Sequence, residues 1–338
     1  MGDRGGVERF PRRLHRPRRE AARQGGRGAR PQDARRLRVA LQLSGILPPV
    51  VTPFRSDGSV DEAAFAANLD SYAAEDLGGY LVLGSNGEAA SLTEEEKLQL
   101  LRCARARAGG RTLLAGTGLE STRETIAFTR KAADLGVDAA LVLTPHYYKA
   151  QMTVEVLRRY FEAVADASPI PVLLYSVPAF TGLPFPPALA AQVAGHRQIA
   201  GMKESAGDLG LLGRIIASVP SSFQVVCGSG PVLYPALCMG APAAILAVAC
   251  CAPRPTAAIY RAFRDGDHER ARRIQAALTP LGVAVTATYG VAGLKAAIDL
   301  GGRRGSEPRA PLLPVSSAVR EELRGLLQAA EDAVRAEP

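Results

Sequence analysis

From Leu47 onward the chain alternates short apolar runs with longer stretches of helical periodicity. The apolar runs are continuous and do not alternate with polar residues, which is typical of strands buried on both faces of a parallel sheet. Eight such runs predict eight strands, at residues 47–54, 80–83, 112–115, 139–143, 170–175, 199–202, 223–227 and 244–249.

The segments between these runs have the spacing and the capping residues of helices. Thr93 is followed three residues later by Glu96, and the same spacing separates Ser121 from Glu124. Both pairs match the capping box that begins a helix. Helices are therefore expected over residues 61–75, 93–107, 121–135, 153–167 and 231–239.

Strands that alternate with helices in this way predict an α/β protein built as a closed (β/α)8 TIM barrel. A doubly wound sheet fits less well, because no GxGxxG sequence follows the first apolar run. Only helical patterns follow residue 250, at 255–264, 267–280, 290–300 and 316–335. We therefore predict a barrel over residues 41–252 and a C-terminal helical subdomain over residues 253–338.

The basic character of the chain belongs to its first forty residues. The formal net charge of the whole chain is +8, yet residues 1–40 carry thirteen arginines against four acidic residues, so the remainder is close to neutral. This segment is rich in Arg, Gly, Pro and Ala and has almost no apolar periodicity. Such a composition predicts disorder.

Three explanations of residues 1–40 stay open: a mitochondrial-type presequence, a nucleic-acid-binding arm, and an extension without function. A presequence is rich in serine and poor in acidic residues, whereas the first serine is Ser44 and four acidic residues precede it. An arginine arm binds phosphates without sequence preference, but Phe10 is the only aromatic residue of the segment. We therefore expect no nucleic-acid partner. Translation that begins near Val39 is a further hypothesis.

The cysteine, histidine and apolar content argues against several classes of protein. The five cysteines form no CxxC pair and mostly lie in apolar runs, so we expect reduced, buried thiols and a cytoplasmic location. The four histidines have no metal-ligand spacing, so neither a metal nor another cofactor is expected. No apolar run reaches the roughly 18 residues of a transmembrane helix, and no membrane partner is expected.

One lysine is distinguished by its position. The chain has five lysines and thirty-six arginines, and only Lys203 ends a predicted strand, within the sequence IAGMKES. Removal of water from an ammonium group lowers its pKa, and a deprotonated amine is the nucleophile that forms a Schiff base with a ketone. A guanidinium cannot do this. The alternative is a lysine that only extends from the strand end into solvent.

Other polar and aromatic residues follow the predicted strands, at the end of the barrel where active sites form. Ser85 and Asn86 lie in a turn whose N–H groups suit a carboxylate. Tyr175 ends the fifth strand and Gly228 follows the seventh. Each also has an ordinary structural explanation, since such residues fill turns and pack at strand ends. Glu88 is equally open, as a base or as a charge at a helix N-terminus.

Five sequence motifs, taken in order, resemble one enzyme family. The motifs are GSNGE at 84–88, TPHYY at 144–148, YSVPAFTG at 175–182, GMKES at 201–205 and CGSG at 227–230. In order and spacing they resemble the dihydrodipicolinate synthase / N-acetylneuraminate lyase family of class I aldolases, from about Gly45 to the C-terminal helices. Within that family the chain is most similar to 4-hydroxy-2-oxoglutarate aldolase.

The resemblance implies a role for each matching residue. Lys203 would form the Schiff base with the 2-oxo carbon of the substrate. Tyr175 would move the proton, aided by Ser85 and by Tyr147 from a neighbouring subunit. The pyruvate-type carboxylate would be bound by Ser85 and Asn86. The residues implied to line the pocket are Ser205, Gly228 and Ile245. The implied reaction converts 4-hydroxy-2-oxoglutarate reversibly to pyruvate and glyoxylate, in a homotetramer.

One departure from the family pattern bears on the second substrate. Dihydrodipicolinate synthases usually have an arginine two residues after the proline of the strand-5 loop, which holds the carboxylate of the aldehyde, whereas this chain has Phe180. A phenyl ring cannot replace a bidentate guanidinium, so aspartate semialdehyde is disfavoured. Ser205 and Lys149 are candidates to hold a glyoxylate carboxylate. The alternatives are 4-hydroxy-tetrahydrodipicolinate synthase, another 2-oxo acid or sugar-acid aldolase, and an inactive barrel that acts as a sensor.

Overall fold

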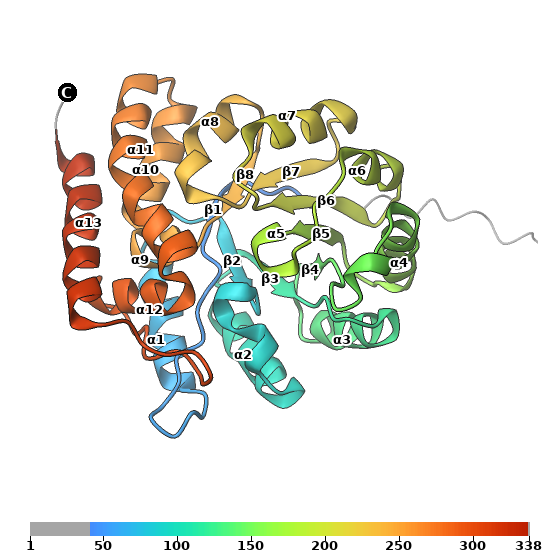
Figure 1. Cartoon of the computed structure of the whole chain (residues 1–338), viewed down its shortest axis with the longest axis horizontal. Coiled ribbons are helices and arrows are strands. Elements are labelled where there is room, and N and C mark those ends of the chain that lie inside the picture. The colour runs from blue at the N-terminus through green and yellow to red at the C-terminus, as the bar shows by residue number, and fades with distance from the viewer. Residues whose placement is uncertain (1–40, 337–338) are drawn as a thin grey trace, which may run out of the picture. The chain divides into compact units, whose positions relative to one another are not determined.

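A computed structural model of the chain describes residues 41–336, which fold around a sheet of parallel strands (Figure 1). The disorder predicted for residues 1–40 lies outside the described residues, as do residues 337 and 338. The strands are β1 (Gly45–Leu47), β2 (Gly79–Val82), β3 (Thr112–Gly116), β4 (Ala139–Leu143), β5 (Val172–Ser176), β6 (Ile199–Glu204), β7 (Gln224–Cys227) and β8 (Ala243–Ile245).

Backbone hydrogen bonds close this sheet into a barrel. The strand order is β1-β8-β7-β6-β5-β4-β3-β2, so each strand pairs with its neighbours in the sequence and β1 pairs with β8. The two ends of this order meet where Val50 N–H donates to Leu81 O (2.8 Å) and Leu81 N–H donates to Pro48 O (3.1 Å). The predicted (β/α)8 barrel is confirmed.

Helices occupy the connections between the strands and continue after the last one. The helices before β8 are α1 (Glu62–Ala73), α2 (Glu94–Arg107), α3 (Thr122–Asp134), α4 (Val154–Ala167), α5 (Pro178–Thr181), α6 (Pro187–Val193), α7 (Leu209–Ser218) and α8 (Leu233–Cys238). Those after β8 are α9 (Val248–Cys251), α10 (Pro253–Arg264), α11 (His268–Val283), α12 (Gly290–Leu300) and α13 (Ser317–Arg335). Two single 3₁₀ turns follow β2, namely η1 (Ser85–Gly87) and η2 (Ala89–Ser91).

Two predicted strands end earlier than their apolar runs. The first run covers residues 47–54, but β1 ends at Leu47, because Pro48 and Pro49 lack the N–H groups that a ladder requires. The last run covers residues 244–249, but β8 ends at Ile245 and the chain enters α9 at Val248. An apolar run by itself does not distinguish a strand from a buried helix.

The capping box predicted for α2 is present. The Thr93 hydroxyl accepts the Glu96 N–H (3.2 Å), and the Glu96 carboxylate accepts the Thr93 N–H (2.9 Å). Ser121 caps α3 by accepting the Glu124 N–H (3.1 Å), but the reciprocal bond from the Glu124 side chain is absent, so the capping box predicted there is only half formed. These caps satisfy N–H groups that the first helical turn leaves without partners.

Side chains of the barrel strands divide between two apolar clusters. In β5, Leu173 and Tyr175 belong to the cluster inside the barrel, whereas Val172 and Leu174 belong to the cluster between the strands and the surrounding helices. This follows from the alternation of side chains along a strand. The alternation places the Tyr175 side chain on the inner face of the barrel.

The helices after β8 gather on one side of the barrel (Figure 1). In this group α10 packs against β1 and α8, α11 contacts α10 and α13, and α12 contacts α9 and α13. The predicted C-terminal helical region is therefore present. All described residues belong to one compact unit, and the division of the chain at residue 252 stays a prediction.

The cysteines are all free thiols within the described residues. Four of them are buried as expected, but Cys238 is exposed. Burial raises the pKa of the Cys227 thiol to about 12, which keeps that side chain protonated and unreactive. None of the helices between residues 41 and 336 combines the length and the apolar character needed to cross a bilayer.

A bidentate ion pair between Glu96 and Arg309 supports a prediction about pH and stability. Arg309 donates to both Glu96 carboxylate oxygens (2.6 and 2.8 Å), which lowers the pKa of Glu96 from 4.5 to about 2. A depressed carboxyl pKa stabilises the fold above pH 4.5, and this contribution is lost as the pH falls toward 2. We expect E96Q to lower the unfolding free energy by about 1–3 kcal/mol at pH 7.

The measurement is urea unfolding of wild type and E96Q between pH 7 and pH 2.5. The two curves should converge as the pH falls, and the exposed neighbour variant E95Q should match wild type throughout. A constant difference between wild type and E96Q at every pH would show that the ion pair is not its source.

Candidate active site

Lys203 and Tyr175 lie side by side on adjacent strands. They are Cα partners in the register of β5 and β6, and the Lys203 Nζ lies 4.5 Å from the centre of the Tyr175 ring. Both side chains are buried, and Lys203 is only 3% exposed. β6 continues through Glu204, beyond the predicted apolar run of residues 199–202. After a register shift near its start, it pairs residue by residue with β5 from Gly201 to Glu204, which fixes the Lys203 backbone. The alternative of a lysine that extends into solvent is excluded.

The burial of Lys203 differs from that of the second buried lysine, Lys295. Lys295 is 0% exposed, pairs with Glu88 at 2.7 Å and donates to two backbone carbonyls. Within residues 41–336, Lys203 has no carboxylate at ion-pair distance. Buried charged groups are ordinarily paired. A buried lysine without a counter-charge is therefore a candidate for chemistry and not for stability.

The turn after β2 brings a hydroxyl group to Tyr175. Ser85 opens η1 directly after Gly84, and its Oγ lies 3.4 Å from the Tyr175 hydroxyl. Asn86 follows in the same turn and is half-buried. The structure therefore joins Ser85, Tyr175 and Lys203 in one chain of contacts.

Ser205 and Gly228 meet beside this group. A Cβ atom added to Gly228 would lie 1.9 Å from Ser205 Oγ and 2.7 Å from the Glu204 carbonyl oxygen, so only glycine fits. The Ser205 Oγ is buried and has no hydrogen-bond partner among the described residues. Such a group is costly unless something else satisfies it. Ile245 is fully buried in the cluster inside the barrel, to which Tyr175 also belongs.

Glu204 occupies the other face of β6. Its carboxylate accepts the Ala206 N–H at 2.8 Å, and burial raises its pKa. Successive strand residues point to opposite faces, so Glu204 stabilises the loop after the strand while Lys203 faces inward.

Tyr147 lies outside this group of contacts. Its side chain is 76% exposed and packs edge-on against Tyr148, and its N–H donates to Glu120 (2.9 Å). Within one chain the predicted role of Tyr147 has no support from a contact, and its action from a neighbouring subunit stays a prediction.

The two residues considered for aldehyde specificity lie on neighbouring loops. Lys149 Nζ is 3.0 Å from the position that a Cβ on Gly182 would take, so this lysine reaches the loop after β5. Phe180 lies in the same loop, in α5, and is 56% exposed. An amine and an exposed phenyl ring therefore lie on the two loops that follow β4 and β5.

Lys295 and Glu88 are the residues that sequence reasoning missed. The sequence left Glu88 open as a base or as a helix N-terminal charge, and neither alternative anticipated that its carboxylate pairs with Lys295 inside the protein. The signal was available in α12, whose sequence GVAGLKAAIDL places a lysine among small and apolar residues.

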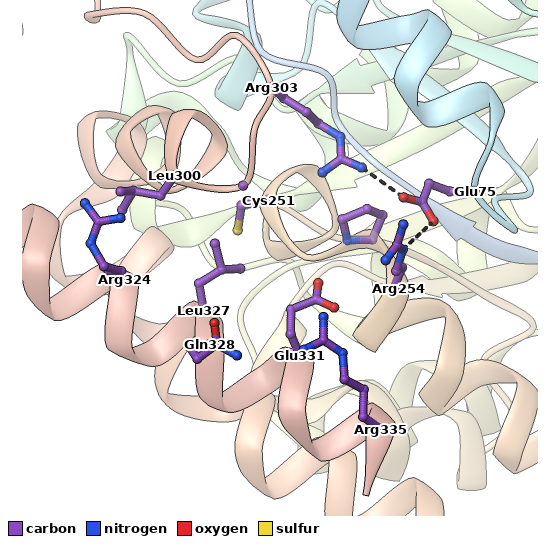
Figure 2. A pocket seen from close by; sticks show the side chains of 12 residues that line it. Glu75, Cys251, Arg254, Leu300, Arg303, Arg324, Leu327, Gln328, Glu331 and Arg335 are labelled. Atoms are coloured by element: carbon purple, nitrogen blue, oxygen red, sulfur yellow. Dashed lines mark hydrogen bonds and ion pairs between the residues drawn. The ribbon is translucent and has the colours of Figure 1, made fainter.

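A pocket of about 410 Å³ lies away from these residues, between α13 and the segments that end α9 and α12 (Figure 2). Within it, Glu75 pairs with Arg303 (3.0 Å) and Arg254 (3.6 Å), and the Arg303 guanidinium lies over the Tyr72 ring. Glu331 of α13 faces the same space, and burial raises its pKa. These charges attach the C-terminal helices to the loop after α1, and none of the predicted site residues lines the pocket.

Comparison with known proteins identifies the family of the chain. A model described as the Dihydrodipicolinate synthetase family matches residues 42–330. The chain belongs to this family. The match covers the barrel and most of the C-terminal helices, as the resemblance of the motifs predicted.

Two relatives are similar to this chain over most of its length. A protein of Exiguobacterium sp. named 4-hydroxy-tetrahydrodipicolinate synthase is 32% identical over 287 residues, which are 85% of this chain and 97% of the relative. A synthase of the same name from Methanoculleus marisnigri is 36% identical over 289 residues, which are 84% of this chain and 98% of the relative.

Solved structures of the family have the same fold. YagE of E. coli K12, determined in complex with pyruvate, superposes with a TM-score of 0.79 at 32% identity and covers 85% of this chain and 98% of its own. The 4-hydroxy-tetrahydrodipicolinate synthase of Methylacidiphilum fumariolicum SolV gives a TM-score of 0.81 at 27% identity, over 87% of this chain and 98% of its own.

Membership of the dihydrodipicolinate synthetase family gives the class of the chain. It is a class I aldolase of the pyruvate-dependent type, a carbon–carbon lyase. Within residues 41–336 no three His, Cys, Asp or Glu side chains are grouped so as to hold a metal ion.

The close approach at Gly228 predicts that even a methyl group is damaging there. We expect G228A to lower the unfolding free energy by about 1–3 kcal/mol, because the added Cβ meets backbone as well as side-chain atoms. Urea unfolding measures this loss. G195A is the matched control, because no atom lies within 4 Å of its added Cβ. Equal stability of G228A and G195A would mean that the strand ends around Lys203 relax freely.

Proposed function

We propose that the chain cleaves 4-hydroxy-2-oxoglutarate reversibly into pyruvate and glyoxylate through a Schiff base on Lys203. The observation that supports this most is the contact chain in which a buried, unpaired amine adjoins Tyr175, whose hydroxyl meets Ser85. An amine, a phenol and a second hydroxyl are the groups that imine formation and proton transfer require.

The chemistry proceeds in balanced steps. The Lys203 amine adds to the C2 carbonyl of the substrate, and water leaves with a proton that the Tyr175 hydroxyl gives up. The products are a protonated imine and a Tyr175 phenoxide. The phenoxide formed in that step takes the proton of the C4 hydroxyl while the C3–C4 bond breaks. Glyoxylate departs, and the electron pair of the broken bond forms an enamine. Protonation at C3 and hydrolysis of the imine then release pyruvate and restore the lysine. Ser85 relays the proton to and from Tyr175.

The remaining residues bind and shape the substrate in this proposal. Ser85 and Asn86 present the N–H groups of η1 to the pyruvate-type carboxylate. Ser205 has an unpartnered hydroxyl next to Gly228 and is available for a polar group of the substrate. Ile245 provides an apolar wall from β8.

The identity of the aldehyde rests on the loops after β4 and β5. Phe180 stands where an arginine would hold the carboxylate of aspartate semialdehyde, and Lys149 reaches the same loop. Glyoxylate is small enough to be held by Lys149 or Ser205. The second candidate is 4-hydroxy-tetrahydrodipicolinate synthase, because the relatives described above carry that name.

Assembly and location belong to the same proposal. The family resemblance implies a homotetramer, and the reduced, mostly buried cysteines favour a cytoplasmic location. In the homotetramer Tyr147 of one subunit would complete the site of the next, and the exposure of this ring is consistent with that role.

Trapping with borohydride tests the Schiff base. Reduction in the presence of pyruvate should add one pyruvate-derived group to Lys203, detected by peptide mass. K203R should remain unmodified, because a guanidinium forms no imine, and K131R, which changes an exposed lysine of α3, should react like wild type. An unmodified Lys203 in the wild-type chain would favour the inactive sensor barrel instead.

Competition between aldehydes tests the reaction. With pyruvate as partner we expect kcat/KM for glyoxylate to exceed that for aspartate semialdehyde by about tenfold or more, because a missing bidentate contact costs at least that much. F180R should reduce the ratio of the two kcat/KM values, because it supplies a guanidinium for the carboxylate of aspartate semialdehyde. A wild-type preference for aspartate semialdehyde would establish the synthase instead.

A further inference from the structure

Backbone strain is concentrated around the turn that carries Ser85 and Asn86. Within residues 41–336, three non-glycine residues have a positive φ: Leu83 (61°), Glu88 (53°) and Ser306 (61°). Leu83 and Glu88 stand immediately before and after the Gly84–Gly87 turn. Each such residue lowers the stability of the fold by about 1–3 kcal/mol, and it keeps this conformation only where contacts with the surrounding structure fix it. The surroundings of this turn therefore need to be identified.

A buried ion pair from the C-terminal helices holds one end of the turn. Lys295 Nζ of α12 donates to Glu88 (2.7 Å) and to the backbone carbonyls of Thr52 and Glu307 (2.9 Å each). The other Glu88 oxygen accepts the Arg309 N–H at 2.9 Å. Three donor bonds from the amine and two acceptor contacts of the carboxylate fix the left-handed Glu88 in place.

A second contact holds the residue before Glu88. The Thr52 hydroxyl donates to the Gly87 carbonyl oxygen (2.7 Å), while the Thr52 carbonyl accepts from Lys295. The Phe54 ring contacts both cations, with the Lys295 amine 4.4 Å and the Arg309 guanidinium 4.3 Å from its centre. Lys295 therefore acts on the turn by two routes, directly through Glu88 and indirectly through Thr52.

Stability alone does not account for this arrangement. Removing two charges from water is expensive, and apolar residues of similar volume often serve a core as well or better. The best-attested use of such pairs is to specify one geometry among several. The geometry specified here is that of a strained turn whose Ser85 hydroxyl meets Tyr175 in the candidate site.

We propose that Lys295 and Glu88 are positioning residues, whose ion pair holds the Ser85–Gly87 turn in the conformation that binds the 2-oxo acid carboxylate. The identity of that ligand rests on the function proposed above. By this mechanism the C-terminal helices contribute to substrate affinity without contacting the substrate.

The test compares K295M, E88Q and the double variant E88Q/K295M. Pyruvate is titrated while the Lys203 adduct is trapped with borohydride, and KM is measured for pyruvate and glyoxylate separately. We expect K295M and E88Q to raise the half-saturating pyruvate concentration by about tenfold or more, because each leaves one buried charge alone. The KM for glyoxylate should change by less than about threefold, since the turn does not bind it.

The double variant separates positioning from stability. E88Q/K295M leaves no buried charge without a partner, so its melting temperature should rise back from that of K295M toward that of wild type. Its half-saturating pyruvate concentration should stay high, because the ion pair that holds the turn is absent. If the pair were merely structural, the double variant would regain both the wild-type melting temperature and the wild-type half-saturating pyruvate concentration. That result overturns the proposal.

Two controls and one further variant complete the design. L278A removes a fully buried side chain of α11 and should lower the melting temperature without changing the pyruvate titration, and K131M should match wild type. If K295M does not fold, E88Q and T52V, which removes the hydroxyl bond to Gly87, test the same prediction. An unchanged pyruvate requirement in these folded variants overturns the proposal.

Hydrogen exchange keeps this proposal distinct from the proposed function. If wild type forms no adduct at all, the proposed function fails, but amide exchange at residues 83–88 still reports on the turn. There we expect about tenfold faster exchange in K295M and E88Q than in L278A. Equal exchange in all three variants overturns the positioning role.

Discussion

The register between β5 and β6 is the constraint on which the candidate site depends. Tyr175 and Lys203 are Cα partners, and because side chains alternate along a strand, a slip of one residue would bring Glu204 inside and turn Lys203 outward. The closed barrel prevents such a slip, since every strand is paired on both sides. The meeting of the amine and the phenol is therefore a property of the whole sheet and not of a local loop.

The two buried lysines show that burial alone does not define a catalytic amine. Lys295 has a carboxylate and two carbonyl partners, and although burial lowers its pKa, Glu88 opposes this shift. Lys203 has the face of an aromatic ring instead of a carboxylate. The difference lies in the partners: the Lys295 amine donates to three oxygens, whereas no carboxylate lies at ion-pair distance from Lys203 among residues 41–336.

The fold and the central residues of the site could be predicted from the sequence for identifiable reasons. Continuous apolar runs indicated the strands, and the position of Lys203 at the end of one of them predicted an amine removed from water. In the structure Lys203 is buried beside Tyr175. The exact strand ends could not be predicted at Pro48 and Val248, because the ends depend on hydrogen-bond partners and not on hydropathy.

The contacts that join distant segments could not be predicted either. Glu88 and Lys295 are 207 positions apart, and no periodicity relates them. Sequence patterns report which face of an element is apolar, but they do not report which polar groups meet across the core. The same limit applies to Tyr147, whose proposed role needs a second copy of the chain.

The buried charges also bear on how the C-terminal region relates to the barrel. Arg309 donates to Glu96 of α2, to Glu88 and to the carbonyls of Gly58 and Ser91, so the segment after α12 is bonded to several barrel loops at once. An appended subdomain would meet the barrel through apolar helix faces alone. Here the polar bonds lie at the end of the barrel that carries Ser85. Their loss would therefore affect the Ser85–Gly87 turn more than it affects the packing of the C-terminal helices. The C-terminal segment is thus part of the framework of the site.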